Sequence, residues 1–265
     1  MDTLALKLIV TPVLILAASL ASGRWGEAVG GWFVGLPLTS GPVCFFLALD
    51  QGTGFAAAAG IGCLAGAAAE AGFCTVYGQV SRRFGWPGAL AAASVAFFAG
   101  VAVLGWAALP LWPLVVLVCA ALGLALWLMP SLEGRGLAVP AVPRWDIPAR
   151  VVVATAVVLG ITALAPYLGP RLSGLFATYP VFAAVMAAFS HRARGPAAGL
   201  QVLRGLLTGL FAFTGFFAVL AIGLERLGLA GGFAAATAVA LVIQAGSLAV
   251  LRRKWTAGVP PALRP

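Results

Sequence analysis

A pattern of residues occurs twice in this chain at one fixed spacing, with no gap. The segment Gly31-Trp32-Phe33-Val34-Gly35-Leu36-Pro37 lies 143 positions before Gly174-Leu175-Phe176-Ala177-Thr178-Tyr179-Pro180, which is the difference between the two proline numbers. The same offset pairs further glycines and phenylalanines: Gly26 with Gly169, Phe46 with Phe189, Gly52 with Gly195, Gly62 with Gly205, Gly66 with Gly209, and Gly72-Phe73 with Gly215-Phe216. So many matches in one register predict an internal duplication in which both halves share one fold.

The composition places this duplicated unit in lipid. Hydrophobic residues make up 62% of the chain and charged residues only 9%, and the mean hydropathy is +1.07. Such a chain has too few polar side chains to cover a water-soluble surface. Several apolar stretches reach the roughly 20 residues that a helix needs to cross a bilayer. No strand-like alternation is present, so we expect an all-α polytopic membrane protein.

Nine spans are predicted, four in each copy and one between them. Repeat one is expected to cover 1–109 and repeat two 149–254, with four spans each, while the unpaired fifth span lies in the connecting segment 110–148 and a tail follows at 255–265. The spans are placed at 5–23, 31–49, 55–79, 88–107, 112–130, 149–168, 174–190, 198–222 and 231–251. Because one central helix separates the copies, the second copy is predicted to be inverted in the membrane, as in many secondary transporters.

The distribution of basic residues predicts the orientation. Lys and Arg prefer cytoplasmic loops. With the N-terminus outside and the C-terminus in the cytoplasm, the inner segments carry Arg24, Arg82, Arg83, Arg135, Arg144, Arg150, Arg192, Arg194, Arg252, Arg253, Lys254 and Arg264. This arrangement in a bacterial inner (plasma) membrane accounts for the net charge of +9, since the inner leaflet is anionic. No nucleic-acid partner is needed to explain it.

The second span contains a cluster of helix-breaking residues that predicts a substrate site. A helix interrupted inside a membrane is tolerated only where protein or a watery cavity covers the break. Breaks at matching positions of two inverted halves indicate substrate binding, because the half-helix N-termini offer unpaired N–H groups. The alternative is a pair of proline kinks that only shape the bundle. The predicted substrate-binding residues are Pro37, Thr39, Ser40, Gly41, Pro42, Thr178, Tyr179 and Pro180.

One acidic residue, Glu70, lies well inside a predicted span. It follows Gly62 and Gly66 at steps of four residues, so it lies on the small-residue side of its helix, which we expect to face protein. An unpaired carboxylate there costs at least a few kcal/mol, so Glu70 should bind a proton or a cation. We assign proton coupling to Glu70, Tyr77 and Arg204. The alternatives are a structural Glu70 and an Arg204 that extends to the interface.

Other chemistries lack support in the sequence. The four cysteines form no CxxC pair and there is one histidine, so neither a metal site nor a cofactor is expected. No P-loop, nucleophile elbow or HExxH motif occurs, which disfavours an enzyme, although a membrane hydrolase using Ser40 or Ser190 is left open. The expected partners are the lipid bilayer and a small-molecule or lipid-linked substrate, and self-association into a homo-oligomer is also left open.

The segment around Pro180 also resembles a known family. The run Ser-Gly-Leu-Phe-Ala-Thr-Tyr-Pro-Val-Phe-Ala at 173–183, followed by a polar loop and two more spans, is similar to the GlpM-like family of small four-span inner-membrane proteins. The resemblance is fainter over spans one to four, where Pro37 is kept and Leu36 replaces the aromatic residue. It implies a tandem fusion of two such units and a loose association with envelope polysaccharide and glycerol metabolism, but it assigns no site residues.

Together these features favour a secondary transporter of a small polar or anionic solute, or of a lipid-linked or envelope precursor. Transport would be proton-coupled and would proceed by alternating access between the inverted repeats. The alternative is a non-transporting scaffold that assembles with an envelope-biosynthetic enzyme. A passive channel is a third hypothesis, for which the chain offers no ring of like polar residues.

Overall fold

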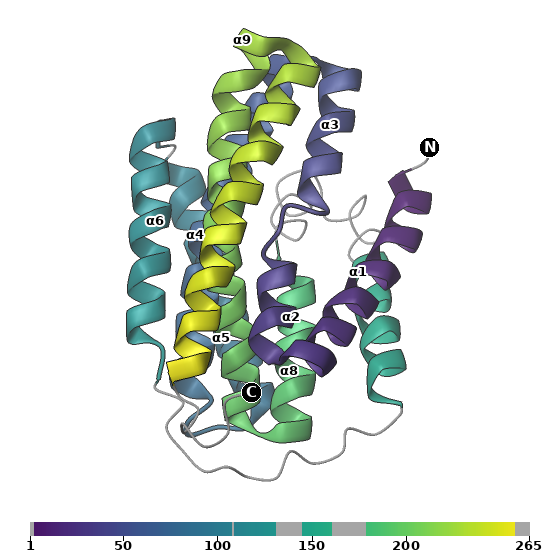
Figure 1. Ribbon diagram of the computed structural model, residues 1–265, viewed down its shortest axis with the longest axis vertical. Coiled ribbons are helices and arrows are strands. Elements are labelled where there is room, and N and C mark those ends of the chain that lie inside the picture. Colours follow the sequence, from purple (N-terminus) through teal and green to yellow (C-terminus); the bar gives the residue numbers. More distant parts are fainter. Residues whose placement is uncertain (1–2, 108, 131–144, 161–178, 258–265) are drawn as a thin grey trace.

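The computed structural model describes residues 3–107, 109–130, 145–160 and 179–257, and within these ranges the chain is helical with no strand (Figure 1). Helix 146–160 is described but carries no label in the figure. The labelled helices are α1 (Thr3–Trp25), α2 (Glu27–Val34), α3 (Ser40–Gln51), α4 (Thr53–Val80), α5 (Trp86–Ala107), α6 (Leu111–Leu128), α8 (Val181–Arg194) and α9 (Pro196–Ala257). The prediction of an all-α protein is confirmed.

Among the described residues, four helical stretches are long and apolar enough to cross a membrane. They are α4, α5, α6 and the stretch Pro196–Leu248 of α9. Large apolar side chains on the outer faces of α5 and α6 are exposed, including Val95, Val116 and Trp127. Such a surface suits a lipid environment better than water. The chain is therefore a helical protein that is able to span a membrane.

The predicted count of nine spans is finer than this finding and stays a prediction. The first two predicted spans fall on α1 and on the pair α2–α3, which are not among the four stretches found in the described residues; α2 and α3 have only 8 and 12 residues, whereas α1 has 23. The predicted spans at 149–168 and 174–190 lie partly outside the described residues. The last two predicted spans both lie within α9.

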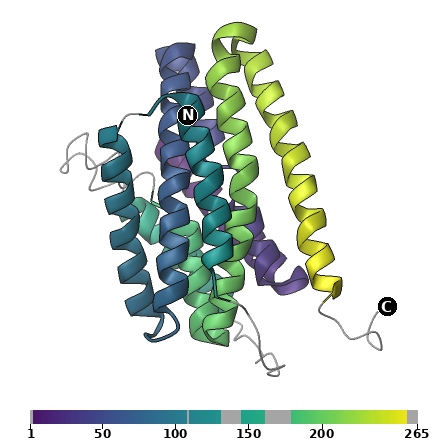
Figure 2. The same cartoon turned by 90° about the vertical axis from the view of Figure 1, so that its left-hand side faces the viewer.

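Helix α9 consists of two antiparallel arms that meet at Gly228. This glycine has φ 69° and ψ −177°, a backbone conformation that L side chains rarely adopt. Figures 1 and 2 show the arms side by side below this turn. The backbones of Gly223 and Gly232 lie so close that a Cβ added to Gly232 would be 3.1 Å from Gly223 C. Gly228 therefore separates two predicted spans, at 198–222 and 231–251.

The first arm of α9 is the central packing element. Helices α2, α4 and α8 all pack against α9. Glycines let α2 approach it closely: a Cβ on Gly31 would collide with the carbonyl of Val202, and one on Gly205 would collide with the carbonyl of Ala28. Gly205 and Gly209, which have the four-residue spacing of a GxxxG motif, therefore pack on α2. Gly31 and Gly35 of α2 have the same spacing. Such small-residue pairs allow helix backbones to meet in membranes.

Around this contact lies the buried apolar core. Its largest fully buried side chains come from α1, α4, α5, α6, α8 and α9: Ile15, Leu64, Phe73, Tyr77, Phe97, Leu122, Met186, Leu203, Leu206, Leu207, Leu210 and Phe217. They join elements from both predicted copies into one core.

The close approach of α2 and α9 can be tested with single methyl groups. Gly205→Ala should lower the free energy of unfolding by about 1–3 kcal/mol, because the added Cβ has no room against Ala28 and Trp32. Gly246→Ala is the matched control, since nothing lies within 4 Å of its Cβ position; it should be neutral or stabilising by up to roughly 1 kcal/mol through helix propensity. Thermal unfolding in detergent compares the two, and equal midpoints would contradict the predicted collision.

Candidate functional site

Two helices begin directly after the same kind of turn at proline. Pro37 lies between α2 and α3, and Pro180 directly precedes α8. At each proline the following N–H donates to the carbonyl of the preceding residue at 2.8 Å: Leu38 to Leu36, and Val181 to Tyr179. This is an inverse γ-turn, and the φ −76° and ψ 62° of Pro180 match it. The predicted interruption of the helix around Pro37 is confirmed.

The helices that follow the two prolines run in opposite directions. Helix α3 begins near the middle of the long axis and runs to the upper end of the view, whereas α8 runs to the lower end (Figure 1). The first backbone hydrogen bond of each helix also involves the proline carbonyl. Gly41 N–H donates to Pro37 O and Ala184 N–H donates to Pro180 O, both at 2.9 Å. Two half-helices therefore start from the interior of the bundle.

A small cavity lies between the first interruption and the start of α8. Thr39 precedes α3 and Phe182 lies in the first turn of α8, and their numbers differ by the repeat offset. The cavity holds about 20 Å³, which is room for about one water molecule. Its lining comes from α1, from both sides of the first interruption and from α8: Leu14, Phe33, Val34, Leu36, Leu38, Thr39 and Phe182. The first interruption and the start of α8 thus border one small space.

A larger space, here called the apolar groove, lies between α3 and the second arm of α9. Its volume is about 560 Å³, within the range of small-molecule sites. The lining is apolar apart from one threonine and comprises Leu36, Pro37, Leu38, Gly41, Pro42, Phe45, Phe46, Phe216, Phe233, Thr237, Ala240 and Leu241. The apolar groove shares Leu36 and Leu38 with the small cavity.

Tyr179 lies in an aromatic cluster with α4 and α5. Its ring stacks on Phe98 and meets Phe97 edge to face, with centroid distances of 5.5 and 5.6 Å, and Phe73 also contacts it edge to face. Its hydroxyl is 2.7 Å from Ser94 Oγ. Tyr179 is therefore held by packing and by a hydrogen bond.

The predicted substrate-binding residues lie in separate places. Pro37, Gly41 and Pro42 line the apolar groove, whereas Thr39 lines the small cavity and Tyr179 belongs to the aromatic cluster. Ser40 begins α3 and lines neither space, Pro180 is the N-cap of α8, and Thr178 lies outside the described residues. The described residues do not combine these side chains into one polar pocket, because the interruptions are covered mainly by apolar side chains.

Among the described residues, no hydrogen bond or ion pair joins any two of the three predicted proton-coupling residues. Glu70 is half-buried, and no hydrogen bond or ion pair joins it to another residue in the described part of the chain. The Tyr77 hydroxyl is 3.1 Å from His191 Nδ1 on α8. Arg204 donates to the carbonyls of Met129 and Pro130 at the end of α6, at 3.1 and 2.7 Å. An arginine commonly satisfies helix-terminal carbonyls in this way, which accounts for its position away from Glu70.

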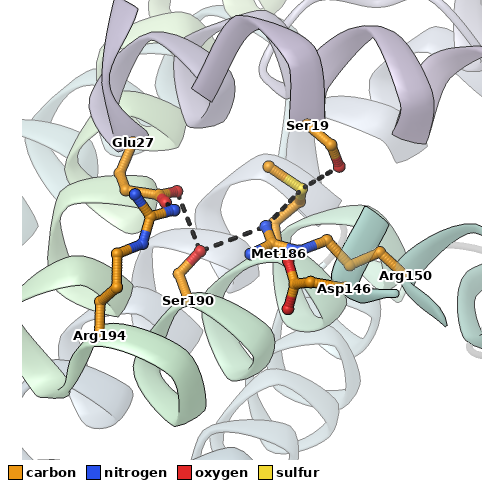
Figure 3. A network of polar contacts seen from close by, with 7 residues as sticks. All are labelled: Ser19, Glu27, Asp146, Arg150, Met186, Ser190 and Arg194. Atoms are coloured by element: carbon orange, nitrogen blue, oxygen red, sulfur yellow. Dashed lines mark hydrogen bonds and ion pairs between the residues drawn. The ribbon is translucent and has the colours of Figure 1, made fainter. Parts of the chain in front are cut away.

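A buried polar network joins the lower ends of helices from the two predicted copies (Figure 3). Glu27 of α2 forms an ion pair with Arg194 and accepts a hydrogen bond from Ser190 Oγ at 2.9 Å, both from α8. Arg150 of helix 146–160 donates to Ser190 Oγ at 3.3 Å and to Asp146 Oδ2 at 2.7 Å. Met186 Sδ accepts from Arg150 and from Ser19 of α1, at 3.5 and 3.4 Å.

The charges in this network balance. Glu27, Asp146 and Arg150 are each no more than 3% exposed, and charges this deeply buried need partners. Two acids face two arginines. Glu27 in the first turn of α2 and Arg194 in the last turn of α8 also have the signs that the helix dipoles favour.

Sequence reasoning did not single out Glu27, Asp146, Arg150 and Arg194 as a site. A local signal was present, because the chain has only seven acidic residues and one of them, Glu27, directly follows Gly26 at the start of a helix. Its partner, however, is far away in the sequence, and only the packing of α8 against α2 joins them. Among the described residues no three His, Cys, Asp or Glu side chains gather closely enough to hold a metal ion.

Comparison with known proteins gave no relative for this arrangement: no family model, no curated protein and no solved structure matches the chain.

The ion pair between the copies should show the behaviour of a buried charge pair. Arg194→Met leaves the Glu27 carboxylate buried without its cation, and we expect the free energy of unfolding to fall by about 3–5 kcal/mol. The double variant Glu27→Gln/Arg194→Met removes both charges and should lose clearly less. Unfolding in detergent measures the double variant and the single variants Arg194→Met and Glu27→Gln, and a double variant that loses the sum of the single losses would show that the pair is not coupled.

Proposed function

We propose that this protein is a secondary membrane transporter built from two inverted repeats. The observation that carries the proposal is the matching pair of γ-turns at Pro37 and Pro180, each followed by the same first helical bond, in helices that run in opposite directions. Interrupted helices at matching positions of inverted halves are a hallmark of transporter substrate sites.

Further matches at the same offset support the repeat. Gly52 and Gly195 both have the positive φ that favours glycine, 90° and 87°, and each separates a short helix from the long helix that follows. Gly88 and Gly231 each lie against the residue four positions earlier, Phe84 and Leu227. We infer nine membrane spans: α1, α2–α3, α4, α5, α6, the helix that begins at 146, α8 and the two arms of α9.

The substrate would bind where the interruptions meet. The small cavity between Thr39 and Phe182 holds about 20 Å³, so we assign the present arrangement to a closed state that must widen during transport. The helix dipole at the start of α3 and the Thr39 side chain that lines the cavity suit a polar or anionic group. We therefore retain a small polar or anionic solute, or the head group of a lipid-linked or envelope precursor, as the substrate class.

The polar network supplies a gate at one end of this path. The pair of Glu27 with Arg194 and the bond between Glu27 and Ser190 hold α2 of one copy against α8 of the other. Rocking of one copy against the other would have to break them. The predicted topology places this gate at the cytoplasmic face, since Arg24, Arg192 and Arg194 lie at the same end of the bundle.

Proton coupling remains assigned to Glu70. Glu70 is half-buried on α4 and forms no hydrogen bond or ion pair with another described residue. Such a position suits a carboxyl group that binds and releases a proton. Tyr77 and Arg204 have partners of their own and would act on coupling only by positioning α4 and α9.

The alternative is a scaffold for an envelope-biosynthetic enzyme, and one observation favours it. The polar residues of the interruptions lie in separate places among apolar neighbours rather than around one pocket. A scaffold would also suit the resemblance to small GlpM-like proteins. The two functions differ in whether the copies move against each other.

Inversion of the copies can be tested with cysteines at twin positions. In a variant whose four native cysteines are replaced, we place single cysteines at Arg83 and Arg226, which differ by the repeat offset and are both exposed. An impermeant maleimide should label Arg226→Cys in intact cells and Arg83→Cys only after permeabilisation. Labelling of both from the same side would contradict inverted repeats and remove the main support for transport.

The gate can be tested by linking the copies chemically. In the same background, Glu27→Cys/Arg194→Cys should cross-link, stop solute movement into proteoliposomes, and recover after reduction. Gln79→Cys/Leu128→Cys is the control, because it links α4 to α6, where Gln79 Nε2 contacts Leu128 O at 2.7 Å, without joining the two copies. Transport that continues through the cross-linked gate would exclude this path.

One assay of internal pH can identify both the transported solute and the coupling ion. Proteoliposomes loaded with a pH-sensitive dye receive polyols, sugar phosphates or carboxylates, and a transported solute should change the internal pH. Glu70→Gln should keep solute movement and lose the pH change, since a glutamine side chain carries no exchangeable carboxyl proton. An unaltered pH change in Glu70→Gln would remove the coupling role. Failure of every solute, with an inner-membrane enzyme co-purifying, would favour the scaffold.

A further inference from the structure

The apolar groove has a filled counterpart in the other half of the chain. At the repeat offset, Leu36 corresponds to Tyr179 and Ala240 to Phe97. Around Tyr179 the space is occupied by rings of the protein itself, since Tyr179 packs against Phe97 and Phe98. In the apolar groove the smaller Leu36 and Ala240 leave about 560 Å³ open. The same backbone arrangement is thus sealed by side chains in one half and open in the other.

The residues that remain in the groove favour an apolar occupant. Thr237, the counterpart of Ser94, is the one polar side chain of its lining. The Ser94 hydroxyl also bonds the carbonyl of Leu90, as hydroxyls in membrane helices commonly do. No charged side chain lines the groove. Burying a polar or charged ligand there would leave its polar groups without partners.

The groove also opens to the side of the bundle. Phe45, Phe46 and Leu241 on its rim are 36%, 40% and 60% exposed, and the α9 arm that carries Leu241 belongs to a membrane-capable stretch. The medium next to such a surface is hydrocarbon. A ligand can therefore enter from the bilayer without crossing water.

The length of the groove along the second arm of α9, roughly 12 Å, is close to the thickness of one leaflet. At a rise of about 1.5 Å per residue, Phe233 and Leu241 lie roughly 8 and 20 Å along the helix from the turn at Gly228. The hydrocarbon core is about 30 Å thick, so one leaflet supplies about 15 Å. An extended acyl chain anchored near the Gly228 end would run along the lining from Phe233 toward Leu241.

We propose that the apolar groove binds one acyl chain of a phospholipid, which occupies the space that the rings of Tyr179 and Phe97 fill in the other half. The comparison of the halves rests on the proposed repeat. Lipid binding itself does not require transport, and the experiment below measures binding alone.

The test uses the full chain in nanodiscs that contain a phosphatidylglycerol with a photoactivatable group in one acyl chain. After illumination, mass spectrometry maps the labelled residues. Labelling at 41–46 and 233–241 should exceed labelling at the exposed outer residues Val95 and Val116, which report ordinary contact with lipid. Equal labelling at all these positions would overturn the proposal.

Variants that copy the filled half make the test specific. Ala240→Phe should reduce labelling of the groove to the level of Val95 and Val116, because it introduces the ring that its counterpart carries. Val242→Phe is the matched control: Val242 is 73% exposed and is absent from the lining, so labelling should persist. Groove labelling that is as strong in Ala240→Phe as in Val242→Phe would overturn the proposal.

A second variant protects the test against misfolding. Leu36→Tyr fills the groove from the opposite wall and should have the same effect, so it decides the outcome if Ala240→Phe fails to fold. Cross-linking between protein copies through 41–46 or 233–241, in place of lipid labelling, would assign the groove to a self-association interface and would also overturn the proposal.

Discussion

Backbone hydrogen bonding inside lipid is the constraint on which the structure depends. A membrane interior offers no water to unpaired N–H and C=O groups, so an interruption of a helix must be covered by protein. At Pro37 and Pro180 the γ-turn pairs one N–H with one carbonyl locally, and α1, α8 and α9 cover the first interruption. The close contact of α2 with α9 through glycine provides part of this cover, since any side chain at Gly31 or Gly205 would hold the two backbones apart.

In the proposed repeat, one backbone arrangement carries different side-chain chemistry in its two halves. Tyr179 closes its space with a hydrogen bond and three ring contacts, whereas Leu36 at the matching position leaves a groove. A duplicated fold needs both copies to keep the turns and close helix contacts, because these set the backbone path. It leaves the residues between them free to diverge. In such a repeat, the two halves can bind different ligands while their backbones keep the same path.

The polar network has the opposite character, because it links the two predicted halves. Glu27 lies in the first predicted copy, while Ser190, Arg194 and Arg150 lie in the second. Buried charges of this kind contribute less to stability than their Coulomb attraction suggests, since each has lost its hydration. Their more specific effect is to fix one relative position of the helices that carry them. That property suits the proposed closed state, in which the Glu27–Arg194 pair and the Glu27–Ser190 bond hold the two predicted copies together.

The sequence by itself determined the helical, membrane-capable character of the chain and the interruption at Pro37. Both follow from local properties: apolar runs of sufficient length leave few soluble alternatives, and a proline cannot continue the hydrogen bonding of a helix. The recurrence of Pro37 at Pro180 was equally visible, because a repeat is a property of the sequence alone. Only the tertiary structure decided that Arg204 bonds the end of α6, that Glu27 meets Arg194, and that Leu36 borders an open groove while Tyr179 is enclosed. These outcomes depend on which helix faces reach van der Waals distance, and that is set by contacts between residues far apart in the chain, such as Gly31 with Val202.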